Sequence, residues 1–210
     1  EWGGRPDYKP GVRSYQDGVP LVVWIFTDHE AFQKYHEERQ GRRLPPGVGG
    51  YFTPKTGYIF LFDLPEGNTE ARIDEINTLC HEGTHQLEFW YGKQVSRWGK
   101  ANVGQDAFSE GLAEYLGSVE MNDKRDLKFT GVNLGRLKSM LEYQRQYKEQ
   151  NREYPVIPIQ KLISFENYNQ VMQWAQAELG IPGGVGLMLL YQQGWAMTLF
   201  LNEYKNGKYK

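Results

Sequence analysis

Two of the 4 histidines in this chain fall within the five-residue segment HEGTH at 81–85. On a helix, His81 and His85 would lie one turn apart on the same face, so both imidazoles can point at one metal ion. Glu82 would then lie about 100° round the helix from His81, where a general base acting on a metal-bound water has to be. The alternative is an ordinary polar helix surface, which leaves this concentration of histidines unexplained. We therefore favour a metal site.

The sequence argues against a histidine as the third metal ligand. In the three-histidine form of this motif the third histidine stands six residues after the second, but position 91 is a tyrosine. The other histidines, His29 and His36, lie upstream in a charged segment, where we expect solvated side chains. A carboxylate is the better candidate, and AFSEGLAEYLG at 107–117 carries Glu110 and Glu114 with i, i+4 spacing. Alone, Glu110 would be read as an exposed helix carboxylate, but beside HEGTH we favour it as the third ligand.

The surrounding segments indicate the elements that position these residues. VPLVVWIF at 19–26 is a β-branched apolar run that predicts a buried strand, and YFTPKTGYIFLFD at 51–63 predicts two short strands around a turn. Between them, a helix is expected to start at Thr27 or Asp28 and to end before Gly41. The sheet is thus predicted to come from the first part of the chain.

The rest of the chain has the spacing of helices. One long helix is predicted to carry HEGTH and to stop at Gly92, with a core face formed at steps of three and four by Ile73, Ile76, Cys80, Thr84 and Leu87. Further helices are predicted over about 106–119, 131–154, 166–179 and 187–204, with a proline-broken connector at 155–165.

Composition narrows the classes of function and partner. A net charge of -2 without a basic stripe argues against nucleic acid and anionic lipid as partners. The uncharged stretch 179–202 is broken by IPGGVG, and its remaining apolar run is shorter than the roughly 20 residues of a membrane span. The single cysteine, Cys80, excludes an internal disulfide and a cysteine-rich zinc site. This chain begins without a signal-peptide pattern, and we expect a secreted or periplasmic bacterial protein whose signal peptide is not in this sequence.

HEGTHQL followed by SEGLAEY at 109–115 resembles the gluzincins, zinc peptidases in which H-E-x-x-H is completed by a glutamate on a following helix. The two motifs are most similar in sequence to those of small bacterial gluzincins of unassigned function. The resemblance implies that His81, His85 and Glu110 bind zinc and that Glu82 is the base. It also implies that Glu114 orients a ligand histidine.

Two further segments are similar to parts of zinc peptidases. YQQGWAMTLFL at 191–201 resembles the Y-x-x-G-A helix of the zinc aminopeptidases, which implies that Tyr191 stabilises the tetrahedral intermediate. The alternative is a core tyrosine. GGYF at 49–52 is compatible with an edge strand in which Gly49, Gly50 and Tyr51 pair with an extended substrate, or with a simple turn. A GxMEN sequence is absent, so recognition of a substrate amino terminus is not implied.

Together these patterns predict one α+β domain over 1–210 with a zincin-like, thermolysin-like fold. A lobe at 1–92 would pack a small mixed sheet on the HEGTH helix, and a mostly helical lobe at 93–210 would supply Glu110 and Tyr191. The expected function is zinc-dependent (Zn²⁺) hydrolysis of peptide bonds in a peptide or protein substrate, with Glu82 activating the metal-bound water. The alternatives are a metal-stabilised binding or interaction module without turnover, and a hydrolase of cell-wall peptide amides.

Overall fold

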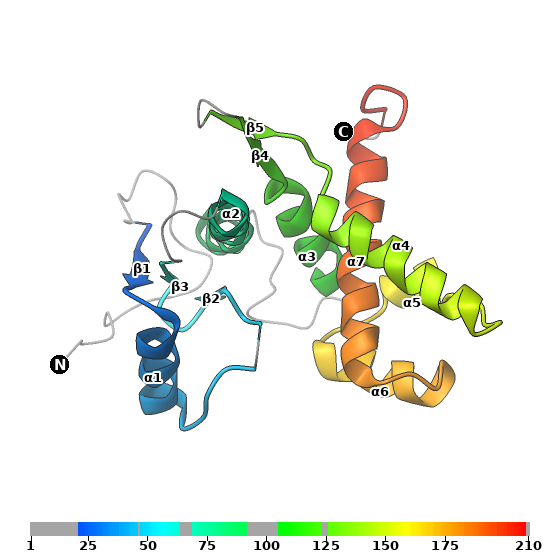
Figure 1. The fold of residues 1–210 in the computed structure, drawn as a ribbon, viewed down its shortest axis with the longest axis horizontal. Coiled ribbons are helices and arrows are strands. Elements are labelled where there is room, and N and C mark those ends of the chain that lie inside the picture. The colour runs from blue at the N-terminus through cyan, green and yellow to red at the C-terminus, as the bar shows by residue number, and fades with distance from the viewer. Residues whose placement is uncertain (1–20, 46, 64–68, 92–104, 123–125, 209–210) are drawn as a thin grey trace. The chain divides into compact units, whose positions relative to one another are not determined.

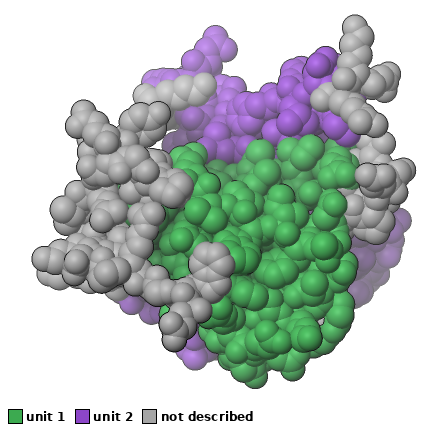
Figure 2. All heavy atoms as spheres, turned by 90° about the vertical axis from the view of Figure 1, so that its left-hand side faces the viewer, with its two compact units in different colours: residues 1–100 green, residues 101–210 purple. Residues whose placement is uncertain are grey.

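The computed structural model describes residues 21–45, 47–63, 69–91, 105–122 and 126–208. The chain forms two compact units, residues 1–100 and residues 101–210, which Figure 2 colours green and purple. The elements labelled in Figure 1 include helices and small sheets, so the predicted α+β class is confirmed. Among the described residues, no helix has the length and apolar character needed to cross a membrane.

The first unit contains a three-stranded mixed sheet. Its strands stand in the order β1-β3-β2, with β1 parallel and β2 antiparallel to the central strand β3. The order along the chain is β1 (Val23–Phe26), α1 (His29–Gln40), β2 (Gly50–Thr53), β3 (Tyr58–Phe62) and α2 (Thr69–Tyr91). The predicted turn and the helix capped by Asp28 are therefore confirmed. The predicted strands are also confirmed, except that the first begins at Val23, because residues 21–22 are not in the strand and residues 19–20 lie outside the described part of the chain.

The prediction that the first strand is buried is wrong. Val23 and Ile25 are 38% and 59% exposed, because β1 is the outer strand of this sheet and only one of its faces packs inward. Trp24 and Phe26 provide that inner face by packing against the ring of Tyr35 of α1. A continuous apolar run is compatible with burial of one face or of both, and periodicity alone does not distinguish them.

Helix α2 is fixed to the sheet by a polar side chain. Gln86 is buried, and its amide nitrogen donates to the carbonyl oxygens of Val22 and Gly57 at 3.1 and 2.8 Å. The predicted apolar face is therefore only partly correct, because Thr84 is buried whereas Leu87 is 48% exposed. Hydrogen bonds from Gln86, rather than burial of Leu87, set the rotation of the helix that carries HEGTH.

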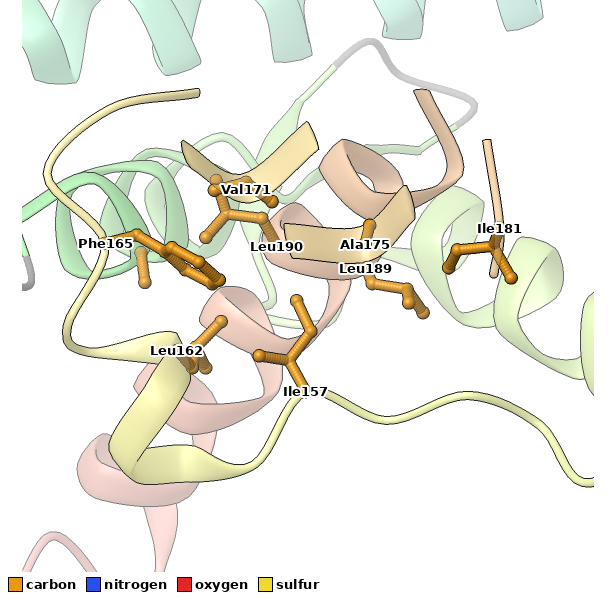
Figure 3. Packing of buried hydrophobic residues seen from close by; sticks show 9 residues of the cluster. Ile157, Leu162, Phe165, Val171, Ala175, Ile181, Leu189 and Leu190 are labelled. Carbon is orange, nitrogen blue, oxygen red and sulfur yellow. The ribbon is translucent and has the colours of Figure 1, made fainter. Parts of the chain in front are cut away.

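The second unit is mostly helical and has an apolar core. Its elements are α3 (Gln105–Leu116), β4 (Val119–Met121), β5 (Leu127–Phe129), α4 (Leu134–Glu149), α5 (Ile159–Leu162), α6 (Tyr168–Glu178) and α7 (Gly183–Glu203). Figure 3 shows the core side chains, which are Ala107, Ile157, Leu162, Phe165, Val171, Ala175, Ile181, Leu189 and Leu190. The predicted long helices are confirmed within a few residues, except that α4 is shorter at both ends.

Three local features of this unit differ from the sequence-based expectation. The antiparallel β4–β5 hairpin was not predicted, because three-residue strands are too short to show alternation. Helix α5 is a single turn inside the proline-broken connector. Helix α7 begins at Gly183, inside the glycine run that was expected to break it. An added Cβ at Gly183 or Gly186 would lie 2.9 or 2.4 Å from side-chain atoms of α6, so these glycines permit close helix packing.

Helices α3 and α7 approach each other closely at a pair of glycines. A Cβ on Gly111 would lie 2.3 Å from the carbonyl oxygen of Gly194, and a Cβ on Gly194 would lie 2.5 Å from that of Ala107. Backbone atoms cannot move aside as the end of a side chain can. The glycine in the middle of SEGLAEY is therefore required by packing, and it fixes the neighbouring Glu110 relative to α7.

We predict that Gly194→Ala destabilises the protein by about 1–3 kcal/mol through overpacking, measured as a lower urea midpoint. Gly184→Ala in the same helix is the matched control, because a Cβ there meets no atom within 4 Å. Its free energy of unfolding should stay equal or rise. Equal midpoints for the two variants would contradict the close approach of α3 and α7.

The structure places one of the two upstream histidines inside the first unit. His36 is only 9% exposed, so the prediction of a solvated side chain is wrong for this residue. Its Nδ1 lies 3.4 Å from the Tyr51 hydroxyl, and its ring packs edge-on against the Tyr51 ring. Burial, with a smaller contribution from the positive charge of Arg42, lowers the pKa of His36. His29 on the same helix is exposed, as predicted.

Because the folded state disfavours protonation of His36, the unfolded chain binds this proton first as the pH falls. The contribution of neutral His36 to stability is complete above the unfolded value of 6.5 and is lost as the pH falls from there through the lowered folded pKa. We predict that His36→Gln flattens the dependence of the unfolding free energy on pH below 6.5. Denaturant titrations across this range measure the slope. A slope in His36→Gln equal to that of the original protein would contradict the effect of burial on His36.

Candidate metal centre

Helix α2 presents His81 and His85 one turn apart, as predicted. Their ring centroids are 5.0 Å apart with the planes nearly perpendicular. His85 is 8% exposed, and its Nδ1 lies 3.4 Å from Oε2 of Glu88 on the next turn of the helix. A carboxylate beside one ring nitrogen favours a proton on that nitrogen and leaves the other nitrogen to bind a metal.

Glu82 is hydrogen-bonded to the edge of the sheet. The backbone N–H of Phe52 in β2 donates to Oε2 of Glu82 at 2.7 Å. An amide donor favours the ionised form of a carboxylate, which is the form that can accept a proton. Strand β2 therefore fixes the direction of the residue predicted to be the base.

In the second unit, Glu110 lies on α3 and is only 2% exposed. Its Oε1 accepts a hydrogen bond from the hydroxyl of Tyr168, at the start of α6. The Tyr168 hydroxyl oxygen also lies 3.3 Å from that of Tyr191 on α7. Burial, followed by the charge of Glu110, raises the pKa of Tyr168, so its phenol keeps its proton. Three helices thus bring two tyrosine hydroxyls to the predicted third ligand.

Glu114, one turn after Glu110, is also buried and accepts two strong donors. Asn133 donates from Nδ2 to Oε2, and Arg136 donates from Nη2 to Oε1, both at 2.6 Å. Burial lowers the pKa of Arg136, but the hydrogen bond and charge of Glu114 outweigh it and raise the pKa. The Arg136 guanidinium also lies 5.0 Å from the centre of the Tyr191 ring. Glu114 therefore anchors a cation beside Tyr191.

One group of side chains in the described part of the chain could hold a metal ion, and it contains the three predicted ligands. The candidate ligand atoms of His81, His85 and Glu110 all lie within 4.8 Å of one another. Two imidazole nitrogens and one carboxylate oxygen form a donor set that suits zinc and leaves a coordination position open for water or substrate. The residues present therefore fit a metal ion bound by three side chains.

The predicted substrate-contacting residues have structural reasons of their own. A Cβ on Gly50 would lie 2.3 Å from the Leu61 side chain, so this glycine permits the close pairing of β2 with β3. The Tyr51 ring stacks on Phe60, and burial raises the pKa of Tyr51 to about 12. Gly49 directly precedes β2, close to Thr78 of α2. Pairing of this strand with a substrate remains a prediction.

Sequence reasoning missed several polar partners of the site. Of their contacts, only that of Glu88 with His85 could have been predicted from the sequence. Glu88 stands three residues after His85 and therefore lies on the same helix face. Asn133 is recognisable as the N-cap of α4, since it accepts from the N–H of Arg136, but its second contact with Glu114 depends on tertiary structure. Nothing in the sequence near Tyr168 indicates that its hydroxyl reaches Glu110.

The segment that carries these residues matches a protein family. Comparison with known families matches residues 75–209, more than half of the chain, to the family described as "Protein of unknown function (DUF1570)". The match includes HEGTH, SEGLAEY, Tyr168 and Tyr191 but not the three strands of the first unit. No curated protein and no solved structure matched the chain. The chain therefore belongs to the DUF1570 family.

Proposed function

We propose that this protein is a zinc-dependent hydrolase of peptide bonds with a gluzincin-type site. The observation that carries the proposal is the grouping of His81, His85 and Glu110 within 4.8 Å, on the motif that also contains Glu82. A purely structural zinc site usually closes all four positions with protein ligands. Three ligands with a carboxylate immediately after the first histidine favour chemistry over a structural role.

Each residue has a task that follows from its chemistry. Zinc held by the three ligands would supply a Lewis acid that lowers the pKa of water and polarises a carbonyl group. The Glu82 carboxylate, directed by the Phe52 N–H, accepts the proton of the attacking water and returns it to the leaving amine. The amine then departs as a neutral group, and Glu82 is ionised again.

Tyr191 is proposed to donate its hydroxyl proton in a hydrogen bond to the carbonyl oxygen as negative charge develops there. Support comes from its neighbours, because Arg136 holds a positive charge over its ring at 5.0 Å. Glu114 in turn holds Arg136 in place. Such donors are commonly worth about 10²–10³ in kcat.

The zincin-like fold is part of the same proposal. It is supported by a small mixed sheet with its edge strand bonded to Glu82, and by helix α2, which carries H-E-x-x-H. A second helix, α3, carries the glutamate in a unit that is mostly helical. An extended peptide is the substrate that suits an edge strand beside a metal site, so peptide amides are the expected class, including those of cell-wall peptides.

We predict that Glu82→Gln keeps zinc binding but lowers kcat on peptide substrates by about 10²–10⁴, because the amide cannot accept the proton. Glu75→Gln is the matched control on the same helix, since Glu75 pairs with Arg72 at 2.8 Å. The control should retain the original kcat. Turnover of a fluorogenic peptide library and zinc content per chain are measured for each variant.

Full activity in zinc-loaded Glu82→Gln would contradict the mechanism. A zinc-loaded original protein without any turnover would favour the binding-module alternative.

A further inference from the structure

We propose that Tyr168 is a positioning residue of the metal centre. Its hydroxyl holds the Glu110 carboxylate in one orientation for the metal. The same hydroxyl accepts a hydrogen bond from Tyr191, which can later pass to a substrate oxygen. This inference rests on the proposed function, and it assigns a residue that HEGTH, SEGLAEY and the Y-x-x-G pattern leave out.

Tyr168 is well placed to hold another group because its own backbone is fixed. It is the first residue of α6, and Asn167 caps that helix by accepting the N–H of Gln170 at 3.0 Å. Val171 and Ala175 of α6 are fully buried in the core against α7. Figure 3 shows these two side chains among the other members of that core. The phenol therefore extends from the start of a helix that is capped and packed into the core.

Counting protons gives the direction of the hydrogen bonds. A phenol has one proton to donate, and Tyr168 donates it to Oε1 of Glu110. The 3.3 Å contact between the two hydroxyl oxygens must then use the proton of Tyr191, with the Tyr168 oxygen as acceptor. The chain of donors runs from Tyr191 to Tyr168 and ends on the carboxylate.

The two links of this chain differ in strength. A bond from a phenol to a buried carboxylate is charge-assisted and strong. The link between the hydroxyls, at 3.3 Å, exceeds the usual O–H···O distance of about 2.7–2.8 Å and joins two neutral groups. Tyr191 can therefore transfer its hydrogen bond to a substrate oxygen that gains negative charge, while Tyr168 remains on Glu110.

The tyrosines consequently have separable effects. Loss of the Tyr168 hydroxyl should release Glu110 and weaken metal affinity by about 10–100-fold, the usual effect of removing a partner of a metal ligand. Loss of the Tyr191 hydroxyl leaves the hydrogen bond from Tyr168 to Glu110 in place. It should leave metal affinity within about threefold, well below that range, and act on kcat.

The test compares the full chain with Tyr168→Phe, Tyr191→Phe and Tyr154→Phe. Tyr154 is the matched control, because its half-buried hydroxyl donates to Oε1 of Gln192 at 2.6 Å, away from the proposed ligands. Zinc affinity is measured by competition with a chromophoric chelator, and the Co²⁺ absorption spectrum reports the ligand geometry. Thermal unfolding without metal confirms that each variant is folded at the temperature of the titration.

We expect Tyr168→Phe alone to lose zinc affinity and to alter the Co²⁺ spectrum. Zinc affinity of folded Tyr168→Phe equal to that of Tyr154→Phe would overturn the role of Tyr168 and leave the proposed function standing. A Tyr191→Phe variant that loses as much affinity as Tyr168→Phe would overturn the separation of roles. An original protein that binds no zinc would overturn both this inference and the proposed metal centre.

Discussion

Burial of the Glu110 carboxylate at 2% exposure is the constraint on which the rest of the site depends. A carboxylate removed from water costs several kcal/mol unless donors or a cation compensate it. Tyr168 supplies one hydrogen-bond donor. The candidate ligand atoms of His81, His85 and Glu110 lie within 4.8 Å of one another, so a cation could bind among them. A divalent metal held by all three side chains, as proposed, would offset this negative charge. The proposed metal would therefore add to the stability of the fold as well as supply chemistry.

Several packing contacts and hydrogen bonds of the second unit hold the Glu110 carboxylate in place. The close approach at Gly111 and Gly194 sets α3 against α7 with little freedom to shift. Asn133 and Arg136 fix Glu114 one turn further along α3. The apolar core keeps α6 and α7 together, and with them the two tyrosine hydroxyls. In the first unit, Gln86 and Phe52 have the corresponding tasks for α2 and Glu82. Hydrogen bonds to side chains and to the backbone fix the polar groups, while glycines and apolar residues fix the helices.

The sequence allows prediction of the parts that local chemistry determines. Helix spacing places His81 and His85 on one face, and the i, i+4 carboxylates of SEGLAEY mark a second helix with a polar face. Turn residues at Pro54 to Gly57 separate β2 from β3, and Asp28 caps α1. Each of these features is decided within a few residues of the chain, so it is visible in the sequence alone.

Features that depend on tertiary packing escaped prediction. Gly183 and Gly186 usually indicate a break, but here they lie inside a helix because α6 approaches too closely for a side chain. His36 stands among charged residues, yet α1 turns it toward Tyr51. The bond from Tyr168 to Glu110 joins residues of different helices far apart in sequence. Periodicity does not report which side chains meet across such distances.

The most direct test of the central claim is X-ray absorption spectroscopy of the zinc-loaded protein, combined with metal analysis. The account predicts one zinc per chain, with imidazole scattering from two histidines and a carboxylate oxygen at about 2.0–2.2 Å. Glu110→Ala should remove the carboxylate contribution and leave the two imidazoles. Zinc coordinated through sulfur at about 2.3 Å, for which Cys80 is the sole thiol, would contradict the account. So would a spectrum from which the Glu110 substitution removes nothing.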